Sequence, residues 1–405
     1  MVNVAVLGYG TVGSGVAEVI WTNQEVIDKR VGEELRIKYV LDLREFPGDP
    51  VSEVLTHDFE DIINDEEVNI VVEVMGGIEP AYTFVKRSLM AGKSVATSNK
   101  ALVAKHGAEL LKIAKEMNVN FLFEASVGGG IPILRPLHSS LTGDVIEEIT
   151  GILNGTTNYM MTKMFYEGAN YDEVLKEAQA NGYAERNPEA DVEGHDACRK
   201  IAILASLISG KKVDFEDIYC EGITKITVED MKYAKAMGMT IKLLASCKRD
   251  GEKMNAIVSP CLLNKNHPLF NVDGVFNSIF VHGNMLGDAM FYGSGAGKLP
   301  TASAVVGDIV EEAKHLNRHL GVMWSEDKYE LEDKNSVSRR FFVRMAGCMD
   351  EMKESILDNF GMVQFVNADI CGEFGFVTEE MPEGIYEEKA KAYTNKIVGM
   401  IRVEG

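Results

Sequence analysis

Short apolar runs alternate with amphipathic stretches through the first third of the chain. Five of these runs have the length and residue types of buried strands, at 4–8, 35–41, 69–74, 94–97 and 120–123. Residues 11–29 place apolar side chains at helical spacing, and further helices are predicted from Pro80 and after Lys100. Strands separated by helices predict an α/β fold with a doubly wound parallel sheet, whose ligand crevice lies at the carboxyl ends of the strands.

From about Val145 the pattern becomes a mixed α+β arrangement. Helices are predicted at 171–180 and 193–209, and strands at 255–262, 275–282 and 289–292. The chain then passes through a glycine turn into a helix at 301–316, which we expect to complete the first domain. The middle region is therefore predicted to be an insertion.

The last part of the chain predicts a small module. Residues 322–339 are rich in charge and are predicted to be a linker. Strand, helix, two strands, helix and strand follow, which is the βαββαβ order of a ferredoxin-like fold. The predicted domains are a dinucleotide-binding domain of 1–143 with 295–321, a substrate-binding and dimerisation domain of 144–294, and a terminal module of 340–405.

Composition narrows the possible partners and the compartment. The net charge of −21 over 405 residues argues against nucleic-acid or anionic-membrane binding, which needs a basic surface. No apolar run approaches the length of a membrane span, and the chain enters a strand at once without the basic start of a signal peptide. The six cysteines are scattered without a C-x-x-C pair, which favours reduced thiols and a cytoplasmic protein.

The turn after the first strand indicates a cofactor. Gly-x-Gly-x-x-Gly follows a strand and opens a helix, which predicts a Rossmann-like dinucleotide-binding turn made by Gly8, Gly10, Thr11, Val12 and Gly13. Asp42 ends the second strand and favours NAD, because it can accept hydrogen bonds from the ribose hydroxyls. Arg44 could instead hold the 2′-phosphate of NADP, so both cofactors stay open, with NAD slightly preferred.

Further candidates follow other strand ends, as the crevice rule requires: Gly76, Ser98, Lys100 and Glu124. The Gly295–Gly297 turn opens a helix and could either bring backbone close to a cofactor or simply connect two domains. The glycine run after Glu124 could turn carbonyls towards a hard cation. The residues alone favour a helix cap or a salt bridge for Glu124.

The segment 181–200, NGYAERNPEADVEGHDACRK, has the most specific chemistry. Four acids lie in a loop broken by Gly, Asn and Pro: Glu185, Glu189, Asp191 and Glu193. The next helix places Asp196 and Lys200 one turn apart on one face. Carboxylates suit an ammonium group on a ligand, and a nearby lysine can donate a proton or hold an alkoxide. The alternative is a solvated acidic surface with an ordinary helix salt bridge.

Four blocks resemble homoserine dehydrogenases and occur in the family order: EASVGGGIPI at 124–133, GILNGTTNYMMTKM at 151–164, AQANGYAERNPEADVEGHDACRK at 178–200 and GSGAGKLPTASAV at 293–305. The resemblance covers about residues 1–321. It implies the NAD(P)-dependent, reversible reduction of L-aspartate 4-semialdehyde to L-homoserine in threonine, methionine and isoleucine biosynthesis. The rival functions are another NAD(P)-dependent amino-acid or hydroxy-acid oxidoreductase and a non-enzymatic nucleotide and amino-acid sensor.

The resemblance also implies roles for single residues. Lys200 matches the proton donor to the substrate oxygen, and Lys100 matches a second active-site lysine near nicotinamide and substrate. The substrate-binding acids would be Glu185, Asp191 and Asp196. Gly182 and the Gly295–Gly297 turn fall at cofactor contacts. A site for a monovalent cation, sodium, would consist of Glu124 with the carbonyls of Val127, Gly129 and Ile131, which overturns the helix-cap interpretation of Glu124.

The terminal module resembles an ACT domain in the order of its elements. It has Gly347-Cys348-Met349-Asp350 where a Pro-Gly turn usually follows the first strand, so effector binding there stays open. The effector that the pathway implies is threonine. Relatives pair their sheets across a two-fold axis, so we expect a homodimer or homotetramer acting on a small-molecule substrate.

Overall fold

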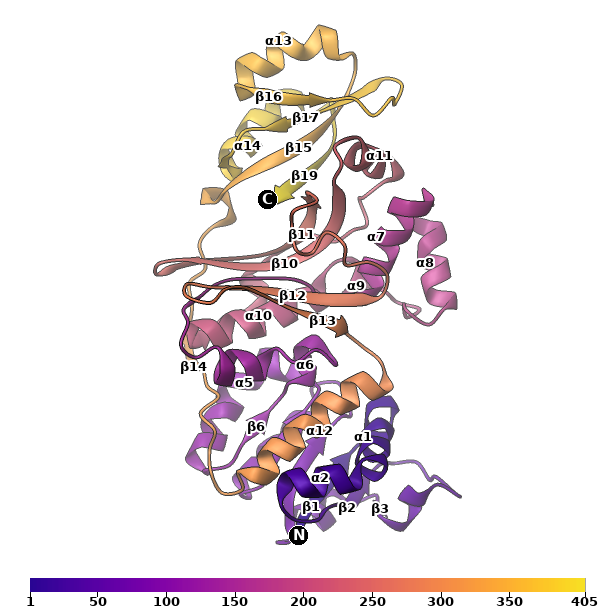
Figure 1. The fold of residues 1–405 in the computed structure, drawn as a ribbon, viewed down its shortest axis with the longest axis vertical. Helices are drawn as coiled ribbons and strands as arrows, with labels where there is room; N and C mark the ends of the chain where they lie inside the picture. Colours follow the sequence, from indigo (N-terminus) through magenta and orange to yellow (C-terminus); the bar gives the residue numbers. More distant parts are fainter. Residues whose placement is uncertain (405) are drawn as a thin grey trace. The chain divides into compact units, whose positions relative to one another are not determined.

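The computed structural model describes residues 1–404, which form two compact units (Figure 1). The first unit consists of 1–145, 202–215 and 291–329, and the second of 146–201, 216–290 and the chain from 330 onward. Among the described residues, no helix is both long enough and apolar enough to span a membrane.

The first unit is built on a six-stranded parallel sheet. Its strands are β1 (Val2–Leu7), β2 (Leu35–Leu41), β3 (Leu55–Thr56), β4 (Val68–Glu73), β5 (Ser94–Thr97) and β6 (Phe121–Leu122). The order β3-β2-β1-β4-β5-β6 and the parallel pairings confirm the predicted doubly wound, Rossmann-like sheet. The strand order reverses direction between β1 and β4, which places a ligand crevice at their carboxyl ends.

Helices cover this sheet: α1 (Thr11–Thr22), α2 (Gln24–Val31), α3 (Phe59–Ile63), α4 (Ala81–Met90), α5 (Lys100–Glu116), α6 (Ala125–Gly128) and α12 (Lys298–Lys314). The single helix expected at 11–29 is wrong, because Asn23 leaves helical geometry (φ −108°, ψ 21°) and separates α1 from α2. The returning helix α12 lies along α1 in Figure 1. A Cβ on Gly15 would lie 2.9 Å from the Cβ of Ala302, so the two helices pack closely.

The second unit contains a large mixed sheet of order β13-β12-β7-β10-β11-β19-β15-β17-β16. Its first five strands are β7 (Ile146–Ile152), β10 (Thr240–Asp250), β11 (Lys253–Leu263), β12 (Phe276–Gly283) and β13 (Gly287–Ser294). The sequence prediction missed β10. Eight consecutive residues at its start are buried, so it lacks the polar alternation that identifies a half-exposed strand.

The other elements between 155 and 236 are α7 (Gly155–Glu167), α8 (Tyr171–Ala180), α9 (Glu189–Val192), α10 (His195–Ser209), β8 (Lys211–Lys212), β9 (Tyr219–Cys220) and α11 (Val228–Ala236). Of these, β8 and the part of α10 from residue 202 belong to the first unit. Helix α8 has the predicted bounds. The helix expected at 193–209 begins two residues later, at His195.

The C-terminal elements follow the expected βαββαβ order: β15 (Ser338–Ala346), α13 (Met349–Phe360), β16 (Val363–Val366), β17 (Glu373–Thr378), α14 (Glu383–Ala390) and β19 (Ile397–Glu404). They do not form a separate sheet. β19 pairs in parallel with β11, with Cys261 opposite Arg402, so one sheet runs through the whole second unit.

The segment 322–339, expected as a linker, is more ordered than a charged linker. It contains a strand, β14 (Ser325–Lys328), which pairs with β8. Trp324 is buried and packs on Gly107, where a Cβ would lie 2.6 Å from the indole ring. The buried indole supplies an apolar contact, which the charged composition of the segment did not predict.

Candidate active site

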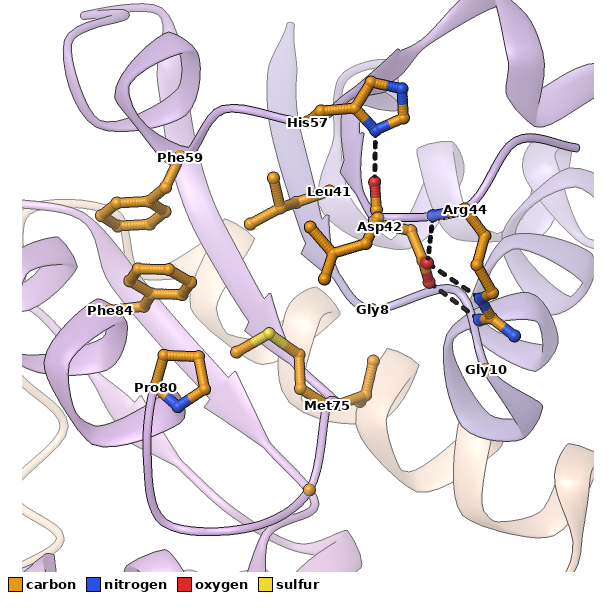
Figure 2. Close-up of a pocket in the computed structure, with 13 residues that line it drawn as sticks. Gly8, Gly10, Leu41, Asp42, Arg44, His57, Phe59, Met75, Pro80 and Phe84 are labelled. Carbon is orange, nitrogen blue, oxygen red and sulfur yellow. Dashed lines mark hydrogen bonds and ion pairs between the residues drawn. The ribbon is translucent and has the colours of Figure 1, made fainter.

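The glycine turn and the ends of β2 and β4 line a pocket of about 570 Å³ in the first unit (Figure 2). Gly8 has φ +99°, and its N–H donates to Leu41 O at 2.8 Å. A Cβ on Gly13 would lie 1.9 Å from Gly8 O, so only glycine fits there. This close turn leaves the first N–H groups of α1 at the pocket, an arrangement that binds pyrophosphate in dinucleotide folds.

Asp42 holds the turn from the end of β2. Its Oδ2 accepts hydrogen bonds from Tyr9 N at 2.8 Å and from Arg44 Nη2 at 2.9 Å. The Arg44 guanidinium, followed by the backbone N–H groups, keeps the pKa of Asp42 well below its usual range, so the carboxylate is charged at neutral pH. Figure 2 shows Asp42 between His57 and Arg44, with Phe59 and Phe84 across the pocket.

A buried acid joins the loops after β4 and β5. Glu73 is fully buried and accepts hydrogen bonds from Met75 N at 2.9 Å, Gly76 N at 3.3 Å and Thr97 Oγ1 at 2.6 Å. Burial raises the pKa of Glu73. Sequence reasoning missed Glu73, although an acid that ends an apolar strand was a usable signal. The candidates Gly76 and Ser98 lie in the two loops that it connects, and Lys100 is the first residue of α5.

Asp196 and Lys200 form a buried pair in the second unit, as the helical spacing predicted. Lys200 Nζ lies 2.8 Å from Asp196 Oδ2 and donates a hydrogen bond to Leu153 O at 2.7 Å. Asp196 is only 4% exposed and Lys200 only 7%. A surface salt bridge would be open to solvent, so this i, i+4 salt bridge does not belong to a solvated acidic surface.

Asn154 brings a second acid to this pair. Its Nδ2 donates hydrogen bonds to Asp191 Oδ1 at 2.8 Å and to Asp196 Oδ2 at 3.1 Å. Its Oδ1 accepts the N–H of Thr157 at 2.9 Å and so caps α7. Sequence reasoning assigned no role to Asn154. The usable signal was an asparagine at the boundary between a strand and a helix, where its side chain is preferred as a cap.

The structure does not bring every predicted residue to this cluster. Glu185 is exposed, and its backbone carbonyl accepts a hydrogen bond from Gln179 Nε2 at 3.1 Å. Gly182 is also exposed, in a left-handed turn (φ +75°) after α8. The described contacts therefore group Asp191, Asp196 and Lys200, while Glu185 lies on the adjacent loop.

Two glycine loops meet in the first unit. A Cβ on Gly129 (φ +57°) would lie 2.2 Å from Gly295 O, and Gly130 N donates to Ser294 O at 3.1 Å. Gly297 (φ +117°) directly precedes α12. The candidate cofactor turn at Gly295–Gly297 thus packs on the candidate cation loop that contains Val127, Gly129 and Ile131.

Glu124 organises the cation loop through its carboxylate. Its Oε1 accepts the N–H groups of Ile133 at 2.5 Å and Leu134 at 2.8 Å, and its Oε2 accepts that of Arg135 at 2.7 Å. It makes no side-chain cap of α6. The three N–H groups that it accepts open the helical segment 134–140, so it acts as a cap of that segment, as the residues alone favoured. Within residues 1–404, no three His, Cys, Asp or Glu side chains are grouped as a metal ion would require.

A buried network behind this loop was not expected. Asp308 Oδ2 accepts the backbone N–H of Glu124 at 2.8 Å, and its Oδ1 pairs with Arg135. Burial, with a further contribution from Glu124, raises the pKa of Asp308 to about 7. Asp308 and Glu312 are separated by one helical turn of α12, and both are buried.

Comparisons with known proteins agree with this geometry. The family model described as homoserine dehydrogenase matches residues 132–310, and the one described as homoserine dehydrogenase, NAD binding domain matches residues 8–124. A homoserine dehydrogenase of Bacillus subtilis is 47% identical over 324 residues, covering 79% of this chain and 74% of its own length. The chain belongs to the homoserine dehydrogenase family. It is therefore an NAD(P)-dependent oxidoreductase, and the rival of a non-enzymatic sensor is wrong.

Solved homoserine dehydrogenases share the fold. That of Thiobacillus denitrificans has a TM-score of 0.88 and 33% identity, covering 100% of this chain and 98% of its own. A hyperthermophilic archaeal homoserine dehydrogenase in complex with NADPH has a TM-score of 0.66 and 30% identity, covering 77% of this chain and 97% of its own. The predicted enzyme class and the parallel dinucleotide-binding fold are thus confirmed.

Proposed function

We propose that this chain catalyses the reversible, NAD(P)-dependent reduction of L-aspartate 4-semialdehyde to L-homoserine, in the synthesis of threonine, methionine and isoleucine. The observation that carries the proposal is the buried Lys200, held 2.8 Å from Asp196 and linked through Asn154 to Asp191. A buried ammonium beside a small polar cluster can deliver a proton to a substrate oxygen. The bound nicotinamide supplies the hydride.

Other steps of the proposed reaction are assigned to individual residues. Negative charge develops on the aldehyde oxygen during reduction, and Lys200 stabilises that charge and donates the proton. Asp196 and Leu153 O fix the position of the Lys200 ammonium. The carboxylates of Asp191, Glu185 and Asp196 attract the ammonium group of the substrate. Lys100, at the start of α5, acts as the second lysine near nicotinamide and substrate.

The dinucleotide binds, in this proposal, along the pocket of the first unit. Its pyrophosphate lies on the turn of Gly8, Gly10, Thr11, Val12 and Gly13. The further cofactor-binding candidates are Gly76, Ser98, Lys100, Gly182, Gly295 and Gly297. Asp42 accepts from the adenosine ribose, and its negative charge disfavours a 2′-phosphate, so NAD is preferred. Arg44 is already paired with Asp42 and would bind a 2′-phosphate only after releasing that carboxylate.

A sodium ion is proposed at the loop of Glu124. The Glu124 carboxylate already accepts three backbone N–H groups, so the carbonyls of Val127, Gly129 and Ile131 would be the main ligands. Gly129 allows this geometry, because its φ of +57° turns the peptide in a way that other residues rarely adopt. Neutral carbonyl oxygens suit a monovalent cation. Replacing sodium by a bulky organic cation should then lower the rate.

The C-terminal module is proposed to bind threonine and to transmit this binding to the rest of the second unit. The pairing of β19 with β11 supports this role, since it joins the module to the sheet that carries β10 and β7. Threonine can inhibit only if it binds a less active arrangement more tightly. Initial rates with and without millimolar threonine test this, and an unchanged rate would contradict it.

The central experiment measures initial rates with homoserine and either NAD⁺ or NADP⁺. Wild-type protein should turn over homoserine, with a higher kcat/KM for NAD⁺. Lys200→Ala should lower kcat by about two to four orders of magnitude, the usual scale for a positioned acid or base, while NADH still binds. Lys163→Ala is the matched control, because Lys163 makes a partly exposed helix ion pair with Glu167 in the same unit.

Two outcomes would contradict the proposal. If Lys200→Ala keeps more than about a tenth of wild-type turnover, Lys200 is not the proton donor and Lys100 becomes the candidate. If another amino-acid or hydroxy-acid substrate reacts with a higher kcat/KM than homoserine, the substrate assignment is wrong. A higher kcat/KM with NADP⁺ would overturn only the cofactor preference.

A further inference from the structure

Two cysteines from separate elements meet beside the helix that carries Lys200. Cys198 lies on α10, and Cys220 lies on β9. Cys198 follows Gly194 by one helical turn, with its N–H donating to Gly194 O at 2.9 Å, and each of the two thiols shifts the pKa of the other. The Cys220 sulfur also lies 3.1 Å from the position that a Cβ on Gly194 would take, and it is 3.2 Å from Glu193 O. It is therefore in direct contact with the start of α10.

The two thiols have different environments. Cys198 is 3% exposed, whereas Cys220 is partly open to solvent. Their contact, together with burial, raises the pKa of Cys198, and the same contact lowers the pKa of Cys220. An accessible thiol of lowered pKa reacts first with oxidants, and a buried neighbour can then resolve the product. By contrast, burial raises the pKa of Cys247 to about 12 and that of Cys261 to about 11.

We propose that Cys198 and Cys220 form a reversible disulfide on reaction with a hydroperoxide, and that this modification lowers turnover. The Cys220 thiolate attacks the distal peroxide oxygen, the O–O bond breaks, and the leaving oxygen takes up a proton as water or an alcohol. The resulting sulfenic acid is attacked by the Cys198 sulfur. The S–O bond breaks, and the oxygen leaves as water. Two electrons pass from the thiols to the peroxide.

The surrounding backbone leaves little room for this bond to form without movement. Ile223 N donates to Val192 O at 2.8 Å, and a Cβ on Gly222 would lie 2.1 Å from Val192 O. A disulfide brings the sulfurs to about 2.05 Å, well inside hydrogen-bond contact. We therefore expect the chain 220–223 and the start of α10 to shift relative to each other when the bond forms. Asp196 and Lys200 belong to that helix, and a displacement of about 1 Å at a catalytic group can cost about 100-fold in rate.

The experiment treats the full-length protein with hydrogen peroxide and maps disulfides by mass spectrometry of non-reduced peptides. We expect a peptide that links Cys198 to Cys220, a fall in kcat/KM of at least about tenfold, and recovery with dithiothreitol. Cys220→Ser should resist the loss. Cys348→Ser, which removes an exposed cysteine of the C-terminal module, should remain as sensitive as wild type.

Three results would overturn the proposal: no peptide linking Cys198 to Cys220, a linked peptide with unchanged kcat/KM, or full inactivation of Cys220→Ser. The partly exposed Cys220 is chosen because its substitution disturbs packing less than substitution of Cys198. The expected loss of turnover rests on the proposed function, whereas formation of the linked peptide does not. If the linked peptide forms but the protein does not act on homoserine, the proposed function has failed and the disulfide has not.

Discussion

Asn154 shows how one residue can connect a local structural role with a candidate catalytic one. The same side chain caps α7 through Oδ1 and holds Asp191 and Asp196 through Nδ2. A carboxamide suits this place because it is an acceptor and a donor without net charge. It keeps two carboxylates at a distance that repulsion would otherwise increase. The position of Asp196, and through it that of Lys200, thus depends on a residue from another helix.

Asn154→Ala should lower kcat/KM for homoserine by about 10–100-fold, because misplacing a catalytic group by a fraction of an ångström is costly. It should also lower stability by about 1 kcal/mol through loss of the cap. Asn170→Ala is the matched control, since Asn170 caps α8 in the same way through Glu173 N. Steady-state kinetics and thermal unfolding of both variants check this. An equal loss of kcat/KM in the two variants would show that only capping matters.

Glu312 is the second residue whose chemistry depends on its surroundings. It is fully buried, and neither carboxyl oxygen has a hydrogen-bond partner of ordinary geometry among the described residues, although the Leu122 backbone lies close enough to lower the pKa slightly. Burial, with repulsion from Asp308, raises its pKa well above the ordinary value despite the nearby Arg135. The native state therefore keeps a proton that the unfolded chain releases above about pH 4.5. Because the unfolded chain binds fewer protons, stability falls as pH rises from that value towards the native pKa.

Glu312→Gln should remove this fall in stability with rising pH, since glutamine is neutral at every pH and has nearly the same shape. We expect little change in Tm at pH 5 and a higher Tm than wild type at pH 7.5, with the gain growing as pH rises. Glu311→Gln, at a more exposed neighbouring position on α12, should show no such pH-dependent gain. A lower Tm of Glu312→Gln at pH 7.5 would mean that the carboxylate is charged and stabilising there.

At the scale of elements, β19 joins the C-terminal module to the rest of the second unit. It pairs with β11 on one side and β15 on the other. The side chain of Arg402 on β19 is buried and bonds Glu383 of α14 at 2.6 Å and Glu221 at 2.6 Å. Breaking a buried ion pair leaves an uncompensated charge, which typically costs about 3–5 kcal/mol. The C-terminal module therefore contributes to the stability of the unit as well as to any regulation.

Deletion after Asp333 should consequently lower the Tm of the chain by several degrees, because it exposes the edge of β11 and removes the partner of Glu221. Arg402→Met isolates the charge effect while retaining the strand, and it should produce a smaller decrease in Tm. Differential scanning calorimetry measures both. A truncated protein with unchanged Tm would show that the module is an independent attachment.

At the scale of the whole molecule, apolar side chains remain exposed along the β12–β13 hairpin. Phe276, Met285, Leu286 and Met290 are 41%, 82%, 48% and 48% exposed, respectively. β13 also ends the sheet, so one side of its backbone is an edge. Exposed apolar groups beside an edge strand favour association with another chain. A second copy of this chain fits the expected homodimer or homotetramer.

Light scattering at micromolar concentration should accordingly give at least the mass of a dimer. Met290→Lys places a charge on the exposed face of β13 and should shift the mass towards the monomer. Met362→Lys is the matched control, because Met362 is a 72% exposed methionine of the C-terminal region. A wild-type monomer would refute the prediction.

The sequence by itself determined the parallel sheet, the enzyme family and the Asp196–Lys200 pair. The sheet and the pair depend on local spacing, since strand–helix alternation, a glycine turn and an i, i+4 pair are encoded within a few residues. The family followed from four sequence blocks that resemble homoserine dehydrogenases. Only the tertiary structure showed that β19 completes the sheet at β11, that Asn154 holds two acids, and that Cys198 meets Cys220. Each of these contacts joins segments far apart in the chain, and neither propensity nor periodicity specifies which distant partner a segment will meet.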